Sequence, residues 1–320
     1  MAAGLSTPVA FIIFNRPEQT ARVFAAIRAA KPSKLFVVAD GPRAHIATDR
    51  GNCVAAREII DRVDWPCEVV RRYAECNIGL RRNVSEGLDW VFGQTEHAII
   101  LEDDCLPDAT FFPFCEELLE RYAQDRRIAA ISGTNRQPNN RILPDQESYY
   151  FSKFCQIWGW ATWRRAWQLC DQAMPEWPAL RRNGWLKGKT MTAREENFWE
   201  RTFDDSHGNH RDGLNTWDVP WMFSCWRHEM MSIIPSTNLV TNLGFGGSGT
   251  HTKTENNAPV FPMKFPLIHP QQVAVNSEAD RQLQENVFEG ITLAQRLYWK
   301  LRVPLPIWFV RRAMRWLGHS

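Results

Sequence analysis

Three consecutive carboxylates, Glu102-Asp103-Asp104, directly follow the apolar run Ala98–Leu101. Unpaired acidic side chains at the end of a strand repel one another, and a bound divalent cation is the usual remedy. The simpler alternative is that these acids are solvated, or that they and Asp108 stabilise the N-terminus of the next helix. The triplet alone leaves both interpretations open.

Three other apolar runs also end in polar, turn-forming residues: Phe14-Asn15-Arg16, Asp40-Gly41-Pro42-Arg43, and Asn77-Ile78-Gly79-Leu80 with Asn83 shortly after. Such residues offer amide groups to a base, a carboxylate to a ribose and guanidinium groups to phosphate. Each set taken singly is also what an ordinary turn uses. Their recurrence at consecutive strand ends, together with the acidic triplet, favours a shared binding site.

The spacing of apolar residues predicts alternating strands and helices in the first third of the chain. The predicted strands are Pro8–Phe14, Lys34–Ala39, Glu68–Arg72 and Ala98–Leu101, and the predicted helices are Glu18–Ala30, Ala44–Val63, Leu80–Phe92 and Phe111–Ala123. This alternation indicates an α/β fold with a mostly parallel sheet. The ligand crevice of such a sheet lies beyond the carboxyl ends of the strands, where the polar residues are found.

Composition excludes some classes of protein. The 320 residues carry a formal charge of +2 and are 44% apolar, which suits one large domain with a full core and argues against a nucleic-acid partner. The eight cysteines are scattered without a C-x-x-C pair, so we expect small core residues in a reducing cytoplasm. We expect neither a secretory signal nor a first membrane span in residues 1–7.

Together the motifs resemble the nucleotide-sugar half of a GT-A glycosyltransferase, in which an acidic motif closes the central strand. The most specific similarity is to N-acetylglucosaminyltransferase I and its relatives, where a helix start like Pro107–Phe112 follows the acidic triplet. It continues through Gly159-Trp160, Trp217-Asp218 and a glycine-rich stretch that ends in His251. Val219-Pro220 departs from the Trp-Asp-Asp-Trp element of that family.

The resemblance implies metal-dependent transfer of a sugar from a nucleoside diphosphate, with uridine diphosphate favoured, to a hydroxyl group of a glycan or lipid-linked acceptor. Mn²⁺ or Mg²⁺ held by Asp104 would offset the negative charge that develops on the leaving diphosphate. Glu102 and Asp103 would accept hydrogen bonds from ribose or sugar hydroxyls, and His251 would lie near the diphosphate. Asp218 as the single base would give inversion, although a helix N-cap is the alternative role for this residue.

The implied donor-binding residues are Phe14, Asn15, Arg16, Asp40, Gly41, Arg43, Asn77, Gly79, Asn83, Glu102, Asp103 and His251. The donor-binding half would occupy residues 1–105, and the acceptor-binding and catalytic half residues 106–255. A C-terminal extension would follow at residues 256–320.

Many tryptophans lie in the middle of the chain, and an indole face suits the apolar face of a pyranose. Trp158, Trp160 and Trp217 are the candidates for contact with the sugar or the acceptor. Trp160, Trp163 and Trp167 recur at helical spacing, so a place in the core is the alternative for most of them.

The segment at residues 204–212 is also rich in potential metal ligands: Asp204, Asp205, His207, His210 and Asp212. Ser206, Gly208 and Asn209 among them predict a mobile loop rather than a rigid metal site. If this loop acts, closure over the site is the expected role.

The last segment, residues 296–320, is basic and rich in tryptophan, and it contains no acidic residue. Pro304 and Pro306 divide it into two short helices that are too short to span a bilayer. A basic amphipathic helix suits peripheral contact with an anionic membrane on its inner face, as a lipid-linked acceptor would need. Packing against the catalytic domain is the alternative.

Two other functions remain open. A catalytically inert carbohydrate-binding protein on the same fold would use the tryptophans and carboxylates to bind glycans. A sugar-nucleotide pyrophosphorylase is expected to have a glycine-rich loop that ends in a basic residue after the first strand. This chain has Phe14-Asn15-Arg16-Pro17 there.

Overall fold

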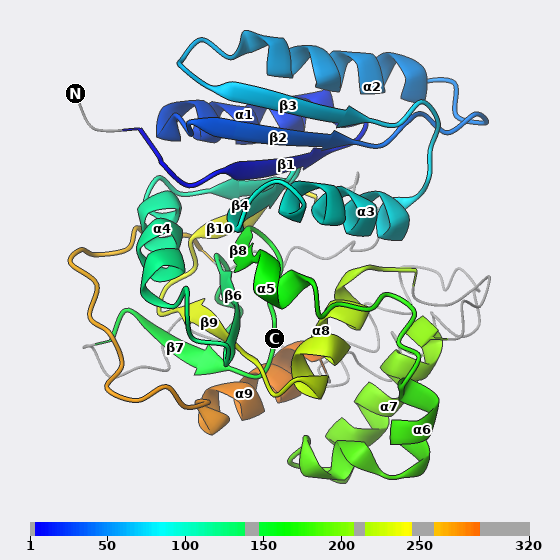
Figure 1. Cartoon of the computed structure of the whole chain (residues 1–320), viewed down its shortest axis with the longest axis vertical. Helices are drawn as coiled ribbons and strands as arrows, with labels where there is room; N and C mark the ends of the chain where they lie inside the picture. Colours follow the sequence, from blue (N-terminus) through cyan, green and yellow to red (C-terminus); the bar gives the residue numbers. More distant parts are fainter. Residues whose placement is uncertain (1–3, 138–146, 208–214, 245–258, 289–320) are drawn as a thin grey trace, which may run out of the picture.

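The computed structural model describes residues 4–137, 147–207, 215–244 and 259–288. An eight-stranded sheet crosses this part of the chain in the order β3-β2-β1-β4-β8-β6-β9-β7 (Figure 1). Its strands are β1 Val9–Ile13, β2 Lys34–Ala39, β3 Glu68–Tyr73, β4 His97–Glu102, β6 Ile128–Ser132, β7 Tyr149–Ser152, β8 Trp160–Trp163 and β9 Met231–Pro235. A small antiparallel pair, β5 Cys105–Pro107 with β10 Val240–Asn242, lies beyond the end of β4.

The direction of the strands decides where a ligand can bind. β1 to β4 are parallel, β8 runs against both β4 and β6, and β7 runs against β9. β6 and β9 therefore run in the same direction as β1 to β4, and their carboxyl ends lie at one edge of the sheet. The predicted α/β class with a mostly parallel sheet is confirmed.

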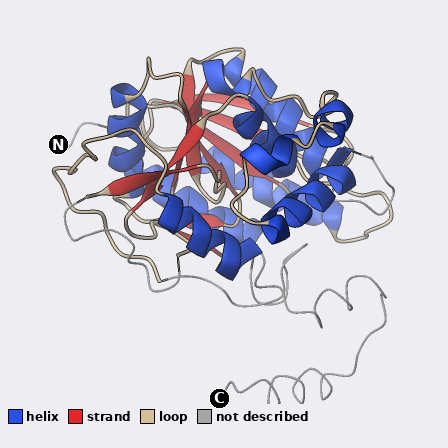
Figure 2. Cartoon of the chain, turned by 90° about the horizontal axis from the view of Figure 1, so that it is seen from below, coloured by secondary structure: helices blue, strands red, loops and turns tan. Residues whose placement is uncertain are grey.

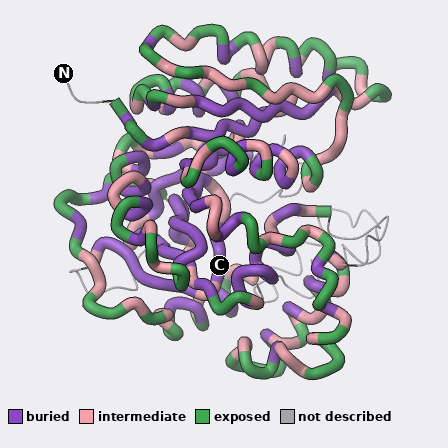
Figure 3. Tube along the Cα trace, in the orientation of Figure 1, coloured by how far each residue is buried: buried purple, intermediate pink, exposed green. Residues whose placement is uncertain are grey.

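Helices cover both faces of the sheet (Figure 2). The α-helices are α1 Pro17–Ala30, α2 Asp49–Glu58, α3 Leu80–Phe92, α4 Phe111–Arg121, α5 Arg164–Trp167, α6 Trp177–Arg182, α7 Ala193–His207, α8 Asp218–Arg227 and α9 Ser277–Leu283. Three short helices are of other types: the 3-10 helices η1 Ile59–Arg62 and η3 Trp185–Gly188, and the π-helix η4 Gln284–Phe288. The strands inside the sheet are mostly buried, whereas the edge strand β3 and the outer helix faces are partly or fully exposed (Figure 3).

Alternating side chains of each strand enter two separate cores. From β1, Val9, Phe11 and Ile13 pack on the face covered by α1, α2 and α4. Ala10 and Ile12 pack on the opposite face, which α3, α5, α7 and α8 cover. Burial on both faces explains why the parallel strands are continuous apolar runs in the sequence.

Predicted elements in the first third are confirmed with small shifts of their bounds. The largest shift is at Ala44–Val63, because residues 44–48 form turns and α2 begins only at Asp49. Helical spacing was misleading at Trp160–Trp163, which is strand β8; Trp160 enters one core and Trp163 the other. Five of the eight cysteines are buried, and all eight are free.

The predicted loop at residues 204–212 is wrong for its first part, since Asp204 to His207 form the last turn of α7. The described residues contain no group of three His, Cys, Asp or Glu side chains that could hold a metal ion. They also contain no helix long and apolar enough to cross a bilayer. His251 and residues 296–320 lie outside the described residues, so the roles predicted for them stay predictions.

Candidate active site

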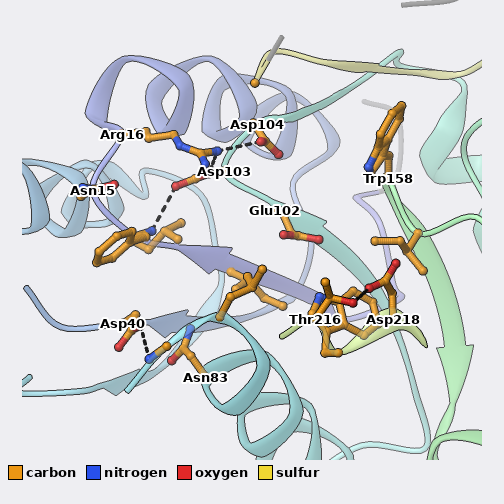
Figure 4. A pocket seen from close by; sticks show the side chains of 18 of the residues that line it. Asn15, Arg16, Asp40, Asn83, Glu102, Asp103, Asp104, Trp158, Thr216 and Asp218 are labelled. Carbon is orange, nitrogen blue, oxygen red and sulfur yellow. Dashed lines mark hydrogen bonds and ion pairs between the residues drawn. The ribbon is translucent and has the colours of Figure 1, made fainter. Parts of the chain in front are cut away.

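A cavity of about 660 Å³ opens at the carboxyl edge of the sheet, and many of the predicted residues line it (Figure 4). The ends of β1, β2 and β4, the start of α3 and the start of α8 all contribute to it. The predicted residues in its lining are Phe14, Asn15, Arg16, Asp40, Arg43, Asn77, Gly79, Asn83, Glu102, Asp103, Asp104, Trp158, Trp217 and Asp218. Residues far apart in the sequence are thus brought together because their strands end at one edge.

Arg16 forms ion pairs with two acids of the triplet, Asp103 and Asp104. Its Nη1 atom lies 2.6 Å from Oδ2 of Asp104 and 3.2 Å from Oδ1 of Asp103. The second oxygen of Asp103 accepts a hydrogen bond of 3.1 Å from the backbone N–H of Phe14. Asp103 is only 5% exposed. Its carboxylate therefore positions Arg16 and the end of β1. The sequence predicts instead that this carboxylate accepts a hydrogen bond from a substrate hydroxyl.

Burial and mutual repulsion raise the pKa of two acids of the triplet. Removal from water raises the pKa of Asp103 to about 7, although the Arg16 guanidinium opposes this effect. The same removal from water raises the pKa of Glu102 well above its ordinary value, and the charges of Asp104, Asp103 and Asp218 add to the effect.

Asp40 supports the turn that carries Asn77 and Gly79. One of its oxygens accepts hydrogen bonds from the backbone N–H groups of Gly41 and Ile78, at 2.8 and 2.9 Å. The other accepts from the Asn77 amide at 2.7 Å and from the Gly79 N–H at 3.1 Å. With four donors on a carboxylate that is 4% exposed, Asp40 orders this wall of the cavity more than it offers itself to a ribose.

Asp49 was missed by the sequence analysis. This acid is 1% exposed and accepts hydrogen bonds from the Asn15 amide at 2.7 Å and from the Arg43 guanidinium at 2.6 and 3.0 Å. The bond from Arg43 holds the pKa of Asp49 at about 2. The Arg43 guanidinium also lies 5.4 Å from the centre of the Phe14 ring. In the sequence Asp49 lies inside the predicted helix Ala44–Val63, where a lone acid is too common to single out.

Asn83 has a buried amide oxygen that lacks a partner among the described residues. The residue is 3% exposed, it lines the cavity from the first turn of α3, and its Oδ1 atom accepts no hydrogen bond within the described part of the chain. Buried amide oxygens without a partner are rare in folded proteins. A hydroxyl or N–H group of a ligand in the cavity would satisfy this oxygen.

Asp218 lies on the opposite side of Glu102 from Asn15 and Asp40, next to Thr216 (Figure 4). The Thr216 hydroxyl donates a hydrogen bond to Oδ1 of Asp218. Helix α8 begins at Asp218, with Trp217 at the N-cap position, so the alternative role of Asp218 as N-cap is wrong. Asp218 lines the cavity, and the bond from Thr216 uses only one of its two carboxylate oxygens, so the residue suits a base.

The residues around Asp104 fit a divalent cation that takes most of its ligands from a substrate and from water. Mg²⁺ and Mn²⁺ are commonly held by one or two carboxylates together with phosphate oxygens. A Cβ atom at Gly244 would lie 2.6 Å from Oδ2 of Asp104, so only glycine leaves this oxygen accessible there. Arg16 already uses the same oxygen, which indicates that the position attracts cations.

Two predicted contacts are corrected. Trp160 does not line the cavity, because it is 1% exposed and packs in the core with its ring centre 5.5 Å from that of Trp217. It cannot contact a sugar. Gly41 does not line the cavity either: a Cβ there would lie 2.4 Å from the backbone of Cys76, so the glycine allows two turns to pack closely.

No family model matches the sequence. Over 112 residues the chain is 30% identical to the alpha-1,3-mannosyl-glycoprotein 2-beta-N-acetylglucosaminyltransferase of Arabidopsis thaliana. The predicted resemblance is confirmed for that stretch. It makes up 34% of this chain and 24% of the plant protein, so the chain spans about a quarter of the length of the curated relative that it matches.

Solved structures give weak similarities. The mannosyltransferase PcManGT from Pyrobaculum calidifontis, in complex with GDP-Man and Mn²⁺, is 15% identical with a TM-score of 0.36, over 57% of this chain and 48% of that one. Mouse xyloside xylosyltransferase 1 is 10% identical with a TM-score of 0.35, over 71% and 85%. An apo UDP-glucose pyrophosphorylase is 8% identical with a TM-score of 0.35, over 74% and 93%. TM-scores this low do not separate the two classes of enzyme.

Proposed function

We propose that this protein is a metal-dependent, inverting glycosyltransferase that uses a nucleoside diphosphate sugar. One observation carries the proposal: a single cavity holds Asp103, Asp104 and the polar strand ends on one side and Asp218 on the other, with Glu102 between them. A donor bound at the strand ends and an acceptor bound at Asp218 can therefore meet inside the same cavity. The sequence similarity to an N-acetylglucosaminyltransferase supports the same class of reaction.

The donor would lie against the ends of β1, β2 and β4. Asn15, Asn77 and Asn83 offer amide groups for the nucleoside, and Arg16 offers a guanidinium group for phosphate. A divalent cation at Asp104, when bound, would neutralise charge on the leaving diphosphate. A uridine diphosphate sugar is the donor that we favour.

Asp218 would accept the proton of the attacking acceptor hydroxyl. Thr216 fixes one carboxylate oxygen by its hydrogen bond, which leaves the other for the acceptor. Glu102, which lies between the two sides, would accept a hydrogen bond from a sugar hydroxyl. Attack from the Asp218 side, opposite the diphosphate, would invert the anomeric carbon without a covalent intermediate.

Slow hydrolysis of nucleotide sugars tests the proposal without knowledge of the acceptor. A panel of UDP and GDP sugars would first be ranked by thermal shift with and without Mn²⁺, because a ligand of the native state raises the melting temperature. We expect Mn²⁺-dependent hydrolysis of the best donor by the wild type and its loss in Asp104→Ala. Asp61→Ala, which removes an exposed acid paired with Arg71, is the matched control.

An inert carbohydrate-binding protein would give no hydrolysis and no Mn²⁺-dependent shift with any nucleotide sugar. Equal hydrolysis by the Asp104→Ala and Asp61→Ala variants would contradict the role of Asp104. A pyrophosphorylase would instead release a nucleoside triphosphate when supplied with the nucleotide sugar and pyrophosphate.

A further inference from the structure

Arg136 is a cation that the donor site does not use. Its guanidinium carbon lies 4.7 Å from the centre of the Trp158 ring, and Trp158 lines the cavity. Arg136 follows the carboxyl end of β6, and Trp158 precedes β8, which runs in the opposite direction. Both residues therefore lie at the edge of the sheet where the acidic triplet ends β4.

The turn that carries Arg136 is fixed on both sides. The Asn135 amide donates to the carbonyl of Pro235 at 2.9 Å, and its backbone N–H donates to Oδ1 of Asn238 at 3.2 Å. The Gln137 amide donates to the carbonyl of Ala279 at 2.7 Å. Such a turn holds the arginine in one place before a ligand arrives, which reduces the entropy lost on binding.

Arg136 also differs from the other arginines of the site. Arg16 and Arg43 are each paired with buried acids. Arg136 is partly buried and forms no ion pair with any residue in the described part of the chain. Removal from water lowers its pKa to about 10. A desolvated guanidinium that stacks on an indole ring and has no acid beside it among the described residues is costly unless an anion completes its contacts.

We infer that Arg136 and Trp158 form a subsite for an acceptor that carries an anionic group, either a carboxylate or a phosphate. Trp158 lies on the Asp218 side of Glu102, away from Asn15 and Asp40, which places this subsite beside the acceptor and not beside the nucleoside (Figure 4). The indole would stack on a sugar ring while the guanidinium fork binds the charged substituent. The inference rests on the proposed function, because it assigns the acceptor side of the same cavity.

Sugars that share the glucose ring but differ in the group at C6 test the inference. Glucose, glucuronate and glucose 6-phosphate would be titrated calorimetrically into protein saturated with UDP and Mn²⁺, so that the phosphate-binding side is already filled. We expect at least one acidic sugar to bind about tenfold more tightly than glucose, as one charge-assisted hydrogen bond provides. The preferred acidic sugar then tells whether a carboxylate or a phosphate is the natural group.

Arg136→Gln should abolish this preference, Arg136→Lys should retain part of it, and Arg127→Gln, which removes an exposed arginine paired with Asp125, should leave it unchanged. Thermal unfolding of each variant checks that the fold is kept. Acidic sugars that bind no more tightly than glucose, or a preference that survives in Arg136→Gln, would overturn the inference. A loss of UDP affinity in Arg136→Gln would also overturn it, by assigning the arginine to the donor.

The two levels of the proposal fail in different ways. If the wild type binds no nucleotide in the presence of Mn²⁺, the proposed function is contradicted, and the acceptor subsite with it. If UDP binds and requires Asp104 but the three sugars are not discriminated, only the subsite is wrong.

Discussion

The Nη1 atom of Arg16 lies 2.6 Å from Oδ2 of Asp104, so the proposed metal ligand is already neutralised by an internal cation. A divalent cation at this carboxylate would be close to the guanidinium group, and like charges at such a distance repel strongly. Arg16 and the metal therefore compete for one oxygen until a diphosphate arrives with enough negative charge for both.

Arg16→Gln should strengthen binding of Mn²⁺ to the nucleotide-free protein by about fivefold, or about 1 kcal/mol, because a competing cation is removed. Electron paramagnetic resonance of free Mn²⁺ measures this affinity directly. Arg28→Gln, which breaks an exposed pair with Asp64, is the control for loss of charge. Weaker or unchanged Mn²⁺ binding in a folded Arg16→Gln protein would show that the two cations do not compete.

Asp218→Asn should reduce turnover by about 10²- to 10⁴-fold, the usual range for removal of a general base. The affinity for the nucleotide should change little, because Asp218 lies across Glu102 from the donor residues. Thr216→Val should have a smaller effect, since it removes only the hydrogen bond that orients the base. Turnover and nucleotide affinity measured on the same preparations separate the two effects.

A weaker nucleotide complex with unchanged turnover in Asp218→Asn would move this residue from the base to donor binding. Glu229→Gln is the matched control, because Glu229 is exposed and pairs with Lys189 beyond the end of α8.

The first third of the fold could be predicted because most of its strands are continuous apolar runs that end in polar turns. Lys34–Ala39 and Leu80–Phe92 have the predicted bounds. The second half was harder, because β6 to β9 are short, and two of them run against the rest. Trp160-Ala-Thr-Trp163 shows the reason: residues three apart suit one face of a helix, yet here they point to the two faces of a strand.

The identity of the site residues could be predicted better than their roles. The type and position of Asp40, Asp103 and Arg43 indicated a binding edge, and all three line the cavity. Their partners depend on tertiary contacts that no local pattern contains, such as the bond from the Phe14 N–H to Asp103 across 89 residues. For the same reason Asp49 and Arg136 were missed.

Trp158 and Trp160 should respond differently to truncation. Trp160→Ala should lower the free energy of unfolding by about 3 to 5 kcal/mol, because this side chain is 1% exposed and stacks within the core. Trp158→Ala should have a smaller effect on unfolding but should weaken the binding of sugars, because Trp158 lines the cavity. Urea denaturation and calorimetry of the two variants compare the effects. Equal destabilisation would indicate that Trp158 also belongs to the core.

The free energy of unfolding should fall as pH rises from 4 to 7, because the buried Asp280 loses its proton over this range. Its carboxylate is 1% exposed and accepts hydrogen bonds from the Ser152 hydroxyl at 2.5 Å and the Lys153 N–H at 3.0 Å. Burial raises its pKa to about 6, although Ser152 and Lys153 oppose the shift and Glu195 adds to it. The folded protein thus holds the proton more tightly than the unfolded chain, so the stabilisation by protonation is complete below the unfolded pKa and is lost as pH rises through about 6.

In Asp280→Asn this loss should be absent. Relative to the wild type, the free energy of unfolding of the variant should rise by about 2 kcal/mol between pH 4 and pH 7, most of what a pKa shift of about two units provides. Urea denaturation across this range measures the difference. Glu278→Gln on the same helix should show the opposite trend, because Arg281 lowers the pKa of Glu278. Parallel pH profiles for Asp280→Asn and the wild type would mean that Asp280 is ionised in the folded protein as readily as in the unfolded chain.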